Sequence, residues 1–239
     1  MSASSIQQHK SLLHMPILGR TVLILGQPDS GKSYLVYDFI SKAQTLPDGP
    51  MFAKVMILSP TAYRQDYWKG LPKEDIYGDP ESYASVIQQV IDHQKSLHES
   101  MQLPVLMVID DCVGQLEGAA GNEFKKILKQ LATSGRWEKI SVMIISQSYK
   151  DGFISNPQVR QSCSCIISAI INGDHRDSLE RDIRQGERKD MRKLTTSAWS
   201  EPYRFLCYDQ TTGCTGDRYS FCKVDEKSVI KGFSIKYRR

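Results

Sequence analysis

Residues 21–33 read TVLILGQPDSGKS, a short apolar run that breaks into a loop bounded by two glycines. The apolar run predicts a buried strand, and Ser33 to Ala43 predict the helix that follows the loop. The loop has the spacing G-x-x-x-x-G-K-[ST], which is typical of loops that bind polyphosphates. It comprises Gly26, Gln27, Pro28, Asp29, Ser30, Gly31, Lys32 and Ser33.

The chemistry of phosphate binding explains this spacing. Gly26 and Gly31 allow backbone dihedrals and a close approach that a Cβ atom would block, so that N–H groups of the loop can surround a polyphosphate. The start of the following helix adds a favourable dipole. We expect Lys32 to contact the β- and γ-phosphates and the Ser33 hydroxyl to complete the ligand shell of Mg²⁺. The segment therefore predicts a nucleotide-binding loop.

The composition is that of a globular protein. The 239 residues can form one sizeable α/β core or two very small domains, and the hydrophobic content of 40% and charged content of 24% are ordinary for a globular protein. The net charge of +4 is compatible with a polyanionic partner but does not establish one.

The sequence has no pattern for secretion or for membrane insertion. The first 20 residues are polar, and their apolar pairs are interrupted by His14 and Pro16. No apolar run approaches the roughly 18 residues of a membrane span. The six cysteines do not make a disulfide framework, and we interpret them as reduced thiols in an intracellular setting.

Apolar runs alternate with helical patterns beyond the loop. Further buried strands are expected at residues 54–60, 105–109, 140–146 and 165–171, and helices are expected from residue 81 and around residues 124–131. Strands that are apolar throughout and separated by helices predict an α/β fold with a mostly parallel sheet and helices on both faces. The aromatic and polar residues 61–80 are expected to be irregular surface.

One domain is expected at residues 20–239, preceded by an N-terminal arm at residues 1–19. Within that domain, the core is placed at about 20–172 and a small C-terminal elaboration at about 173–239.

Two acidic residues, Asp110 and Asp111, follow the third apolar run. Behind a phosphate loop, an apolar strand that ends in acid predicts the second half of a nucleotide site. We assign Asp110 to the Mg²⁺ shell and Asp111 to the attacking water, which it would orient and polarise. The alternative is that the pair caps the helix or turn beyond the strand.

Three further polar residues are candidates for the same site. Gln147 ends the fourth apolar run, where the carboxyl ends of parallel strands face a ligand, so it either contacts the γ-phosphate or terminates the strand. Arg136 precedes the fourth strand and Arg160 precedes the fifth. Each is a candidate arginine finger that completes the site of a neighbouring subunit, or an ordinary surface arginine.

Taken together, these segments resemble the poxvirus-type DNA-packaging ATPases, the viral branch of the FtsK–HerA class. The resemblance spans about residues 21–171 and departs from the family pattern at two residues. Trp137 follows the arginine where the family usually has histidine, and Asp29 lies in the loop where small residues are typical. The segments that carry the resemblance are Gly26–Ser33, Ile57–Pro60, Val108–Asp111, Gly135–Trp137, Ile144–Gln147 and Asn156–Cys163.

The resemblance implies a RecA-like P-loop NTPase fold whose core strands, counted along the chain, lie in the order 5-1-4-3-2. It also implies a homo-oligomeric ring, expected to be a hexamer, that hydrolyses ATP with Mg²⁺. Its partners would be double-stranded DNA, which it drives into a capsid, and capsid portal or vertex proteins. Arg136 or Arg160 would act across the subunit boundary. The implied location is the host-cell cytoplasm or a viral assembly site, or the virion itself.

Two rival functions stay open. A nucleoside or nucleotide kinase also has a phosphate loop but needs an acceptor pocket, and a nucleotide-dependent scaffold would bind nucleotide without turnover.

The charged and cysteine-bearing stretches near the C-terminus have less specific patterns. Residues 175–193 mix both signs, which indicates a solvated helix face with local ion pairs or, alternatively, a surface that faces DNA. The residues Lys231, Lys236, Arg238 and Arg239 lack acidic neighbours and are the better candidates for phosphate contacts. For Cys207, Cys214 and Cys222, buried thiols on paired strands are favoured over a zinc site.

Overall fold

The described strands of the protein, seen in a computed structural model, belong to one sheet. The structure describes residues 7–9, 12–15, 17–112, 118–150, 152–183, 188–211 and 218–224. Within these ranges the strands are β1 (Gln7–His9), β2 (Thr21–Leu25), β3 (Lys54–Leu58), β4 (Ile76–Tyr77), β5 (Val105–Asp110), β6 (Ile140–Ser146), β7 (Cys165–Ser168), β8 (Arg204–Asp209) and β9 (Tyr219–Lys223).

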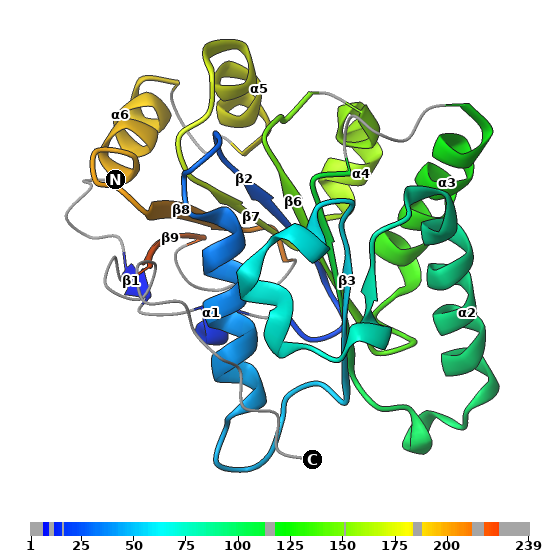
Figure 1. Ribbon diagram of the computed structural model, residues 1–239. Coiled ribbons are helices and arrows are strands. Elements are labelled where there is room, and N and C mark those ends of the chain that lie inside the picture. The colour runs from blue at the N-terminus through cyan, green and yellow to red at the C-terminus, as the bar shows by residue number, and fades with distance from the viewer. Residues whose placement is uncertain are drawn as a thin grey trace.

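The order of the strands across the sheet is β1-β9-β8-β7-β2-β6-β5-β3-β4 (Figure 1). The five core strands β7-β2-β6-β5-β3 are all parallel, and their order confirms the expected 5-1-4-3-2. Only β8 runs against its neighbours among the described strands, because it pairs antiparallel with both β7 and β9. The predicted α/β class with a mostly parallel sheet is therefore confirmed.

Helices cover both faces of the sheet, as the uninterrupted apolar strands predict. They are α1 (Lys32–Gln44), α2 (Tyr83–Ser96), α3 (Gly118–Ser134), α4 (Pro157–Ser162), α5 (Gly173–Ile183) and α6 (Arg188–Ala198). Alternate residues of β2 point to opposite faces: Val22 and Ile24 pack in the cluster that contains α1, and Leu23 and Leu25 pack in the cluster that contains α2 and α3. Figure 1 shows α1 on its own face, with α2 and α3 side by side.

The register of the central strands determines what surrounds the end of β2. Leu25 lies opposite Ser146 of β6 and opposite Ser168 of β7, and Asp110 of β5 lies opposite Ile145 of β6. The strands β2, β5, β6 and β7 therefore end at the same edge of the sheet. Loops that leave these ends converge on one region.

The expectation of an irregular surface at residues 61–80 is wrong. This segment forms short 3₁₀ helices and the strand β4, and it places Trp68 in the core with 0% of its surface exposed. The indole Nε1 donates to Gln65 Oε1 at 2.7 Å, so the buried ring keeps a hydrogen-bond partner. The aromatic and polar residues of this segment thus include a buried ring, Trp68, and its hydrogen-bond partner, Gln65.

The fifth core strand is shorter than expected, because β7 ends at Ser168 and not at Ile171. Beyond Ser168 the chain turns toward the phosphate loop, where the carbonyl of Ile170 accepts a hydrogen bond from the Gln27 amide at 2.9 Å. A contact with the loop therefore replaces the last predicted strand pairs.

The N-terminal segment contributes an edge strand and apolar anchors. β1 pairs in parallel with β9, and Leu12 and Ile17 are buried in the cluster that contains α1. The division of the chain into arm, core and elaboration stays a prediction. In the described part of the chain, no helix combines the length and apolar character needed to span a bilayer.

Candidate active site

The phosphate loop lies between β2 and α1, at the edge where the core strands end. The amide of Gly26 donates to the Ser146 carbonyl at 3.2 Å, which ties the start of the loop to the end of β6. Gly31 has φ of 87°, a left-handed conformation that glycine adopts without steric cost, at the N-cap of α1. Asp29 has φ of 59° and is exposed, so its carboxylate faces solvent.

Lys32 lies beneath this loop, with 8% of its surface exposed. Its Nζ donates to the carbonyls of Gly26 at 2.8 Å and Gln27 at 2.7 Å. Burial lowers the pKa of Lys32, and the negative charges of Asp110 and Asp111 partly oppose that shift. The ammonium group is therefore held by loop carbonyls, in the position from which it could exchange them for phosphate oxygens.

Ser33 and Asp110 form the second part of the site. The Ser33 hydroxyl donates to Asp110 Oδ2 at 3.2 Å, and Asp110 is 4% exposed. Burial raises the pKa of Asp110 to about 6, although the hydrogen bond from Ser33 and the charge of Lys32 act in the opposite direction.

These residues fit Mg²⁺ and a polyphosphate. A hydroxyl and a carboxylate are oxygen ligands of the kind that Mg²⁺ prefers. The Ser30 hydroxyl is buried and has no hydrogen-bond partner among the described residues, so the loop offers at least one unused polar group. Phosphate oxygens in the loop could accept a hydrogen bond from the Ser30 hydroxyl, and Ser33 and Asp110 could hold a divalent cation.

Asp111 follows the last residue of β5 and adopts φ of 56°. This left-handed conformation is tolerated by aspartate better than by most residues, and it leaves the side chain exposed at the same edge. Asp110 itself is the last strand residue, so β5 ends one residue later than the predicted strand at residues 105–109. The structure thus brings Lys32, Ser33, Asp110 and Asp111 together at one edge.

Gln147 comes directly after β6, and its side chain is exposed beside the start of the loop. Sequence reasoning missed a second polar residue at this edge, Asn172, whose Oδ1 accepts a hydrogen bond from Gln27 Nε2. A signal for it existed, because Asn172 directly follows the fifth apolar run. The contact with γ-phosphate proposed for Gln147 stays a prediction.

Arg136 lies at the opposite edge of the sheet from the phosphate loop. It precedes β6, and it lies beside Gly19, which precedes β2. A five-residue parallel strand is about 16 Å long, so Arg136 cannot serve the site of its own chain. Its guanidinium is exposed and lies 4.8 Å from the ring centroid of Trp137. It is therefore available for contact with another molecule.

Arg160 is engaged within the chain. Its Nε contacts Asp182 Oδ2 at 2.9 Å, and its Nη1 donates to the carbonyls of Ile154 at 2.9 Å and Ser155 at 2.8 Å. The guanidinium also lies 4.8 Å from the ring centroid of Tyr149, whose hydroxyl donates to the same Asp182 oxygen. The side chain of Arg160 is 12% exposed. These contacts favour a structural role.

Cys207 and Cys222 lie on the paired strands β8 and β9, where both are free and buried, as expected. The interaction with Cys222 and burial raise the pKa of the Cys207 thiol. Cys214 lies outside the described residues. Among the described residues, no cluster of histidine, cysteine or acidic side chains is arranged to hold a metal ion.

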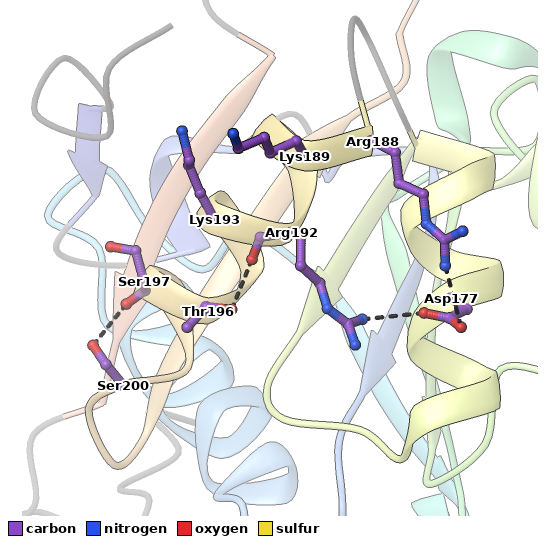
Figure 2. A pocket seen from close by; sticks show the side chains of 8 residues that line it. All are labelled: Asp177, Arg188, Lys189, Arg192, Lys193, Thr196, Ser197 and Ser200. Atoms are coloured by element: carbon purple, nitrogen blue, oxygen red, sulfur yellow. Dashed lines mark hydrogen bonds and ion pairs between the residues drawn. The ribbon is translucent and has the colours of Figure 1, made fainter.

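The described charged residues of 175–183 and 188–193 form ion pairs within and between α5 and α6, as one interpretation of the sequence expected. Arg188 and Arg192 both reach Asp177, at 3.4 and 3.1 Å, across a cavity of about 830 Å³. Figure 2 shows Lys189 and Lys193 pointing away from Asp177. A contact between this surface and DNA stays a prediction, and the terminal basic residues Lys231, Lys236, Arg238 and Arg239 lie outside the described part.

The sheet order and the loop between β2 and α1 give the chain the fold of P-loop NTPases. Neither a protein-family model nor a curated protein sequence matches the chain. Solved structures do match. The genome packaging NTPase B204 of Sulfolobus turreted icosahedral virus 2, in complex with AMP, superposes with a TM-score of 0.55 at 18% identity, over 80% of this chain and 94% of B204.

Two other similar structures are those of a conjugation coupling protein and a secretion ATPase. The pCW3 conjugation coupling protein TcpA, solved with ATPγS, gives a TM-score of 0.57 at 14% identity, over 87% of this chain and 62% of TcpA. The cytoplasmic domain of the type VII secretion ATPase EccC of Thermomonospora curvata gives 0.56 at 11% identity, over 95% of this chain and 28% of that one. The resemblance to packaging ATPases is thereby confirmed at the level of the fold.

Proposed function

We propose that the protein is an ATP-hydrolysing motor that moves double-stranded DNA into a viral capsid. The observation that carries this proposal is the grouping of Lys32, Ser33 and Asp110 behind a glycine-bounded loop at the end of β2. The comparison with B204 supports it, because that packaging NTPase has been solved with AMP, ATP-gammaS and AMPPCP.

The chemistry follows from the positions of the side chains. Lys32 would leave the loop carbonyls and neutralise the β- and γ-phosphates, while amides of the loop hold their oxygens. Asp111 would orient a water molecule and accept its proton as the water oxygen bonds to the γ-phosphorus. The bond from that phosphorus to the bridging oxygen then breaks, releasing ADP and phosphate. Mg²⁺, held by Ser33 and Asp110, would supply further positive charge at the phosphates.

A ring of subunits would complete this site. Arg136 is the better candidate for the finger because its guanidinium is exposed, whereas Arg160 has four contacts within its own chain. A mixing experiment tests the assignment. Arg136→Ala keeps the phosphate loop but lacks the finger, and Lys32→Ala keeps the finger but lacks the loop lysine.

Each variant alone should be inactive, and mixed rings should recover part of the hydrolysis because some interfaces contain both intact partners. Mixtures of Arg160→Ala with Lys32→Ala serve as the comparison. No recovery with Arg136→Ala, and recovery with Arg160→Ala, would reassign the finger.

The motor function is tested by displacement of a triplex-forming oligonucleotide from duplex DNA. The wild-type protein with Mg²⁺ and ATP should release the oligonucleotide, and it should not do so with a non-hydrolysable analogue or as Lys32→Ala. Duplex DNA should also stimulate ATP hydrolysis. Phosphate transfer to a nucleoside would favour the kinase alternative, and tight nucleotide binding with negligible turnover in assembled protein would favour the scaffold.

A further inference from the structure

A second cavity adjoins the phosphate loop on the side away from β6. It has a volume of about 280 Å³, and its walls come from three segments: the loop, the residues after β7 and the residues before β8. Pro28 and Ser30 line it from the loop, Ile170 from the end of β7, and Trp199 and Tyr203 from the approach to β8. The cavity therefore adjoins the phosphate site and shares the loop residues Pro28, Asp29 and Ser30 with it.

Tyr203 is the most constrained of these residues. It has φ of 57°, which is unusual for an aromatic residue and costs free energy that the surrounding structure must offset. Its ring lies so close to Gly31 that a Cβ atom there would be 2.7 Å from Tyr203 Cδ1. Such an outlier beside a functional loop is the kind of observation that points to a role in binding.

The contacts around Tyr203 hold it in this position. Its carbonyl accepts a hydrogen bond from the Val224 amide at 3.1 Å. The neighbouring Glu201 binds Arg204 at 2.7 Å and Lys223 of β9 at 3.0 Å, and the Trp199 indole donates to the Ser168 carbonyl at 2.9 Å. The segment before β8 is thus fixed to β7 and β9, so the ring is placed before any ligand arrives.

The wall opposite the segment before β8 combines the polar loop residues Asp29 and Ser30 with the apolar Pro28, Ala169 and Ile170. Ile170 is 48% exposed although it is a large aliphatic residue, and its carbonyl is bonded to the loop amide of Gln27. An exposed aliphatic side chain together with an aromatic ring suits a flat ligand with apolar faces and a polar edge.

We infer that this cavity, walled by Tyr203 and Ile170, is the subsite for the base of the bound nucleotide. The inference rests on the proposed function, because it requires the triphosphate to occupy the loop. A base joined to that triphosphate would reach the adjoining cavity and stack against the Tyr203 ring. The subsite adds affinity for the nucleoside part of the ligand.

The test compares two ligands in the full-length protein, ATP and inorganic tripolyphosphate, by equilibrium binding. Tyr203→Ala should weaken ATP binding roughly 5- to 150-fold, the range expected for loss of one stacked base. The same variant should bind tripolyphosphate as tightly as the wild type does. Tyr203→Phe keeps the ring and should retain ATP affinity, and Ile170→Ala, an exposed truncation, should weaken ATP only. Trp137→Ala, an exposed aromatic at the other edge, should change neither affinity.

The outcomes separate this inference from the proposed function. If Tyr203→Ala leaves ATP affinity unchanged, or weakens ATP and tripolyphosphate equally, the base subsite is overturned, and equal weakening would show that the ring only supports the loop. If the wild type binds neither ligand, both the proposed function and the subsite fail. If it binds both with the same affinity, the subsite alone fails.

Discussion

Arg160 is expected to stabilise the fold, and Arg160→Ala measures how much. The change removes the 2.9 Å ion pair with Asp182, two hydrogen bonds to the carbonyls of Ile154 and Ser155, and the stacking on Tyr149. Removing one partner of a fully buried ion pair costs about 3–5 kcal/mol. Because the Asp182 side chain is 36% exposed, solvent screening lowers this figure. We expect the free energy of unfolding to fall by about 2–4 kcal/mol.

The assay is equilibrium unfolding in urea, followed by tryptophan fluorescence, together with nucleotide binding and turnover at a temperature where each variant is folded. Arg160→Lys should be intermediate, because it retains a charge near Asp182 but cannot make the same set of hydrogen bonds. Arg136→Ala is the matched control, since that exposed guanidinium should contribute no more than about 1 kcal/mol to stability. An Arg160→Ala protein as stable as the wild type, able to bind nucleotide but without turnover, would refute the structural role.

Three other substitutions test buried groups of the site and of the core. Without metal and nucleotide, Asp110→Asn should stabilise the protein above pH 6. Folding raises the pKa of Asp110 from 3.8 to about 6, so the wild type loses stability as the pH rises through that interval. At 1.36 kcal/mol per pKa unit the loss is about 3 kcal/mol, and the asparagine variant does not have it. Thermal melts should show a difference that disappears below pH 4, and an equal difference at every pH would contradict the assignment. Cys214→Ser leaves the five cysteines that the structure shows as buried. Burial raises the pKa of Cys163 to about 12, which keeps this thiol protonated at pH 8. A thiol reagent at pH 8 should therefore label none of the five before denaturant is added. Labelling of the native protein would speak against that packing. Trp68→Ala should lower the free energy of unfolding in urea by about 3–5 kcal/mol, because the indole is fully buried. A change below about 1 kcal/mol would instead support the interpretation of residues 61–80 as a surface segment.

The core of the fold was predictable because its strands are buried on both faces. A strand such as β6 (Ile140–Ser146) has no polar side to interrupt its apolar run, and the helices between the strands require parallel connections. The phosphate loop was predictable for a different reason, since its spacing reflects a local backbone requirement. Both signals lie within short stretches of the chain.

The remaining features depend on contacts between distant segments. Nothing in the local pattern around Trp68 distinguishes a buried ring from an exposed one, because its burial comes from the sheet face that it covers. Tyr203 lies far from residue 31 along the chain, and only the antiparallel pairing of β8 with β7 brings its ring to the loop. Likewise, the contacts of Arg160 with Asp182 and Tyr149 could not be read from a position before the fifth strand.

The central claim is that residues 26–33 surround the terminal phosphates of ATP and that Lys32 acts on them during hydrolysis. The most direct measurement is the rate of ATP hydrolysis with Mg²⁺ by the wild type and by Lys32→Ala, with thermal melting to confirm that both are folded. The wild type should turn over ATP, and the variant should lose at least about 100-fold in rate, because one preorganised charge at the transferred phosphate is worth that much. A folded Lys32→Ala protein that hydrolysed ATP at the wild-type rate would contradict the claim.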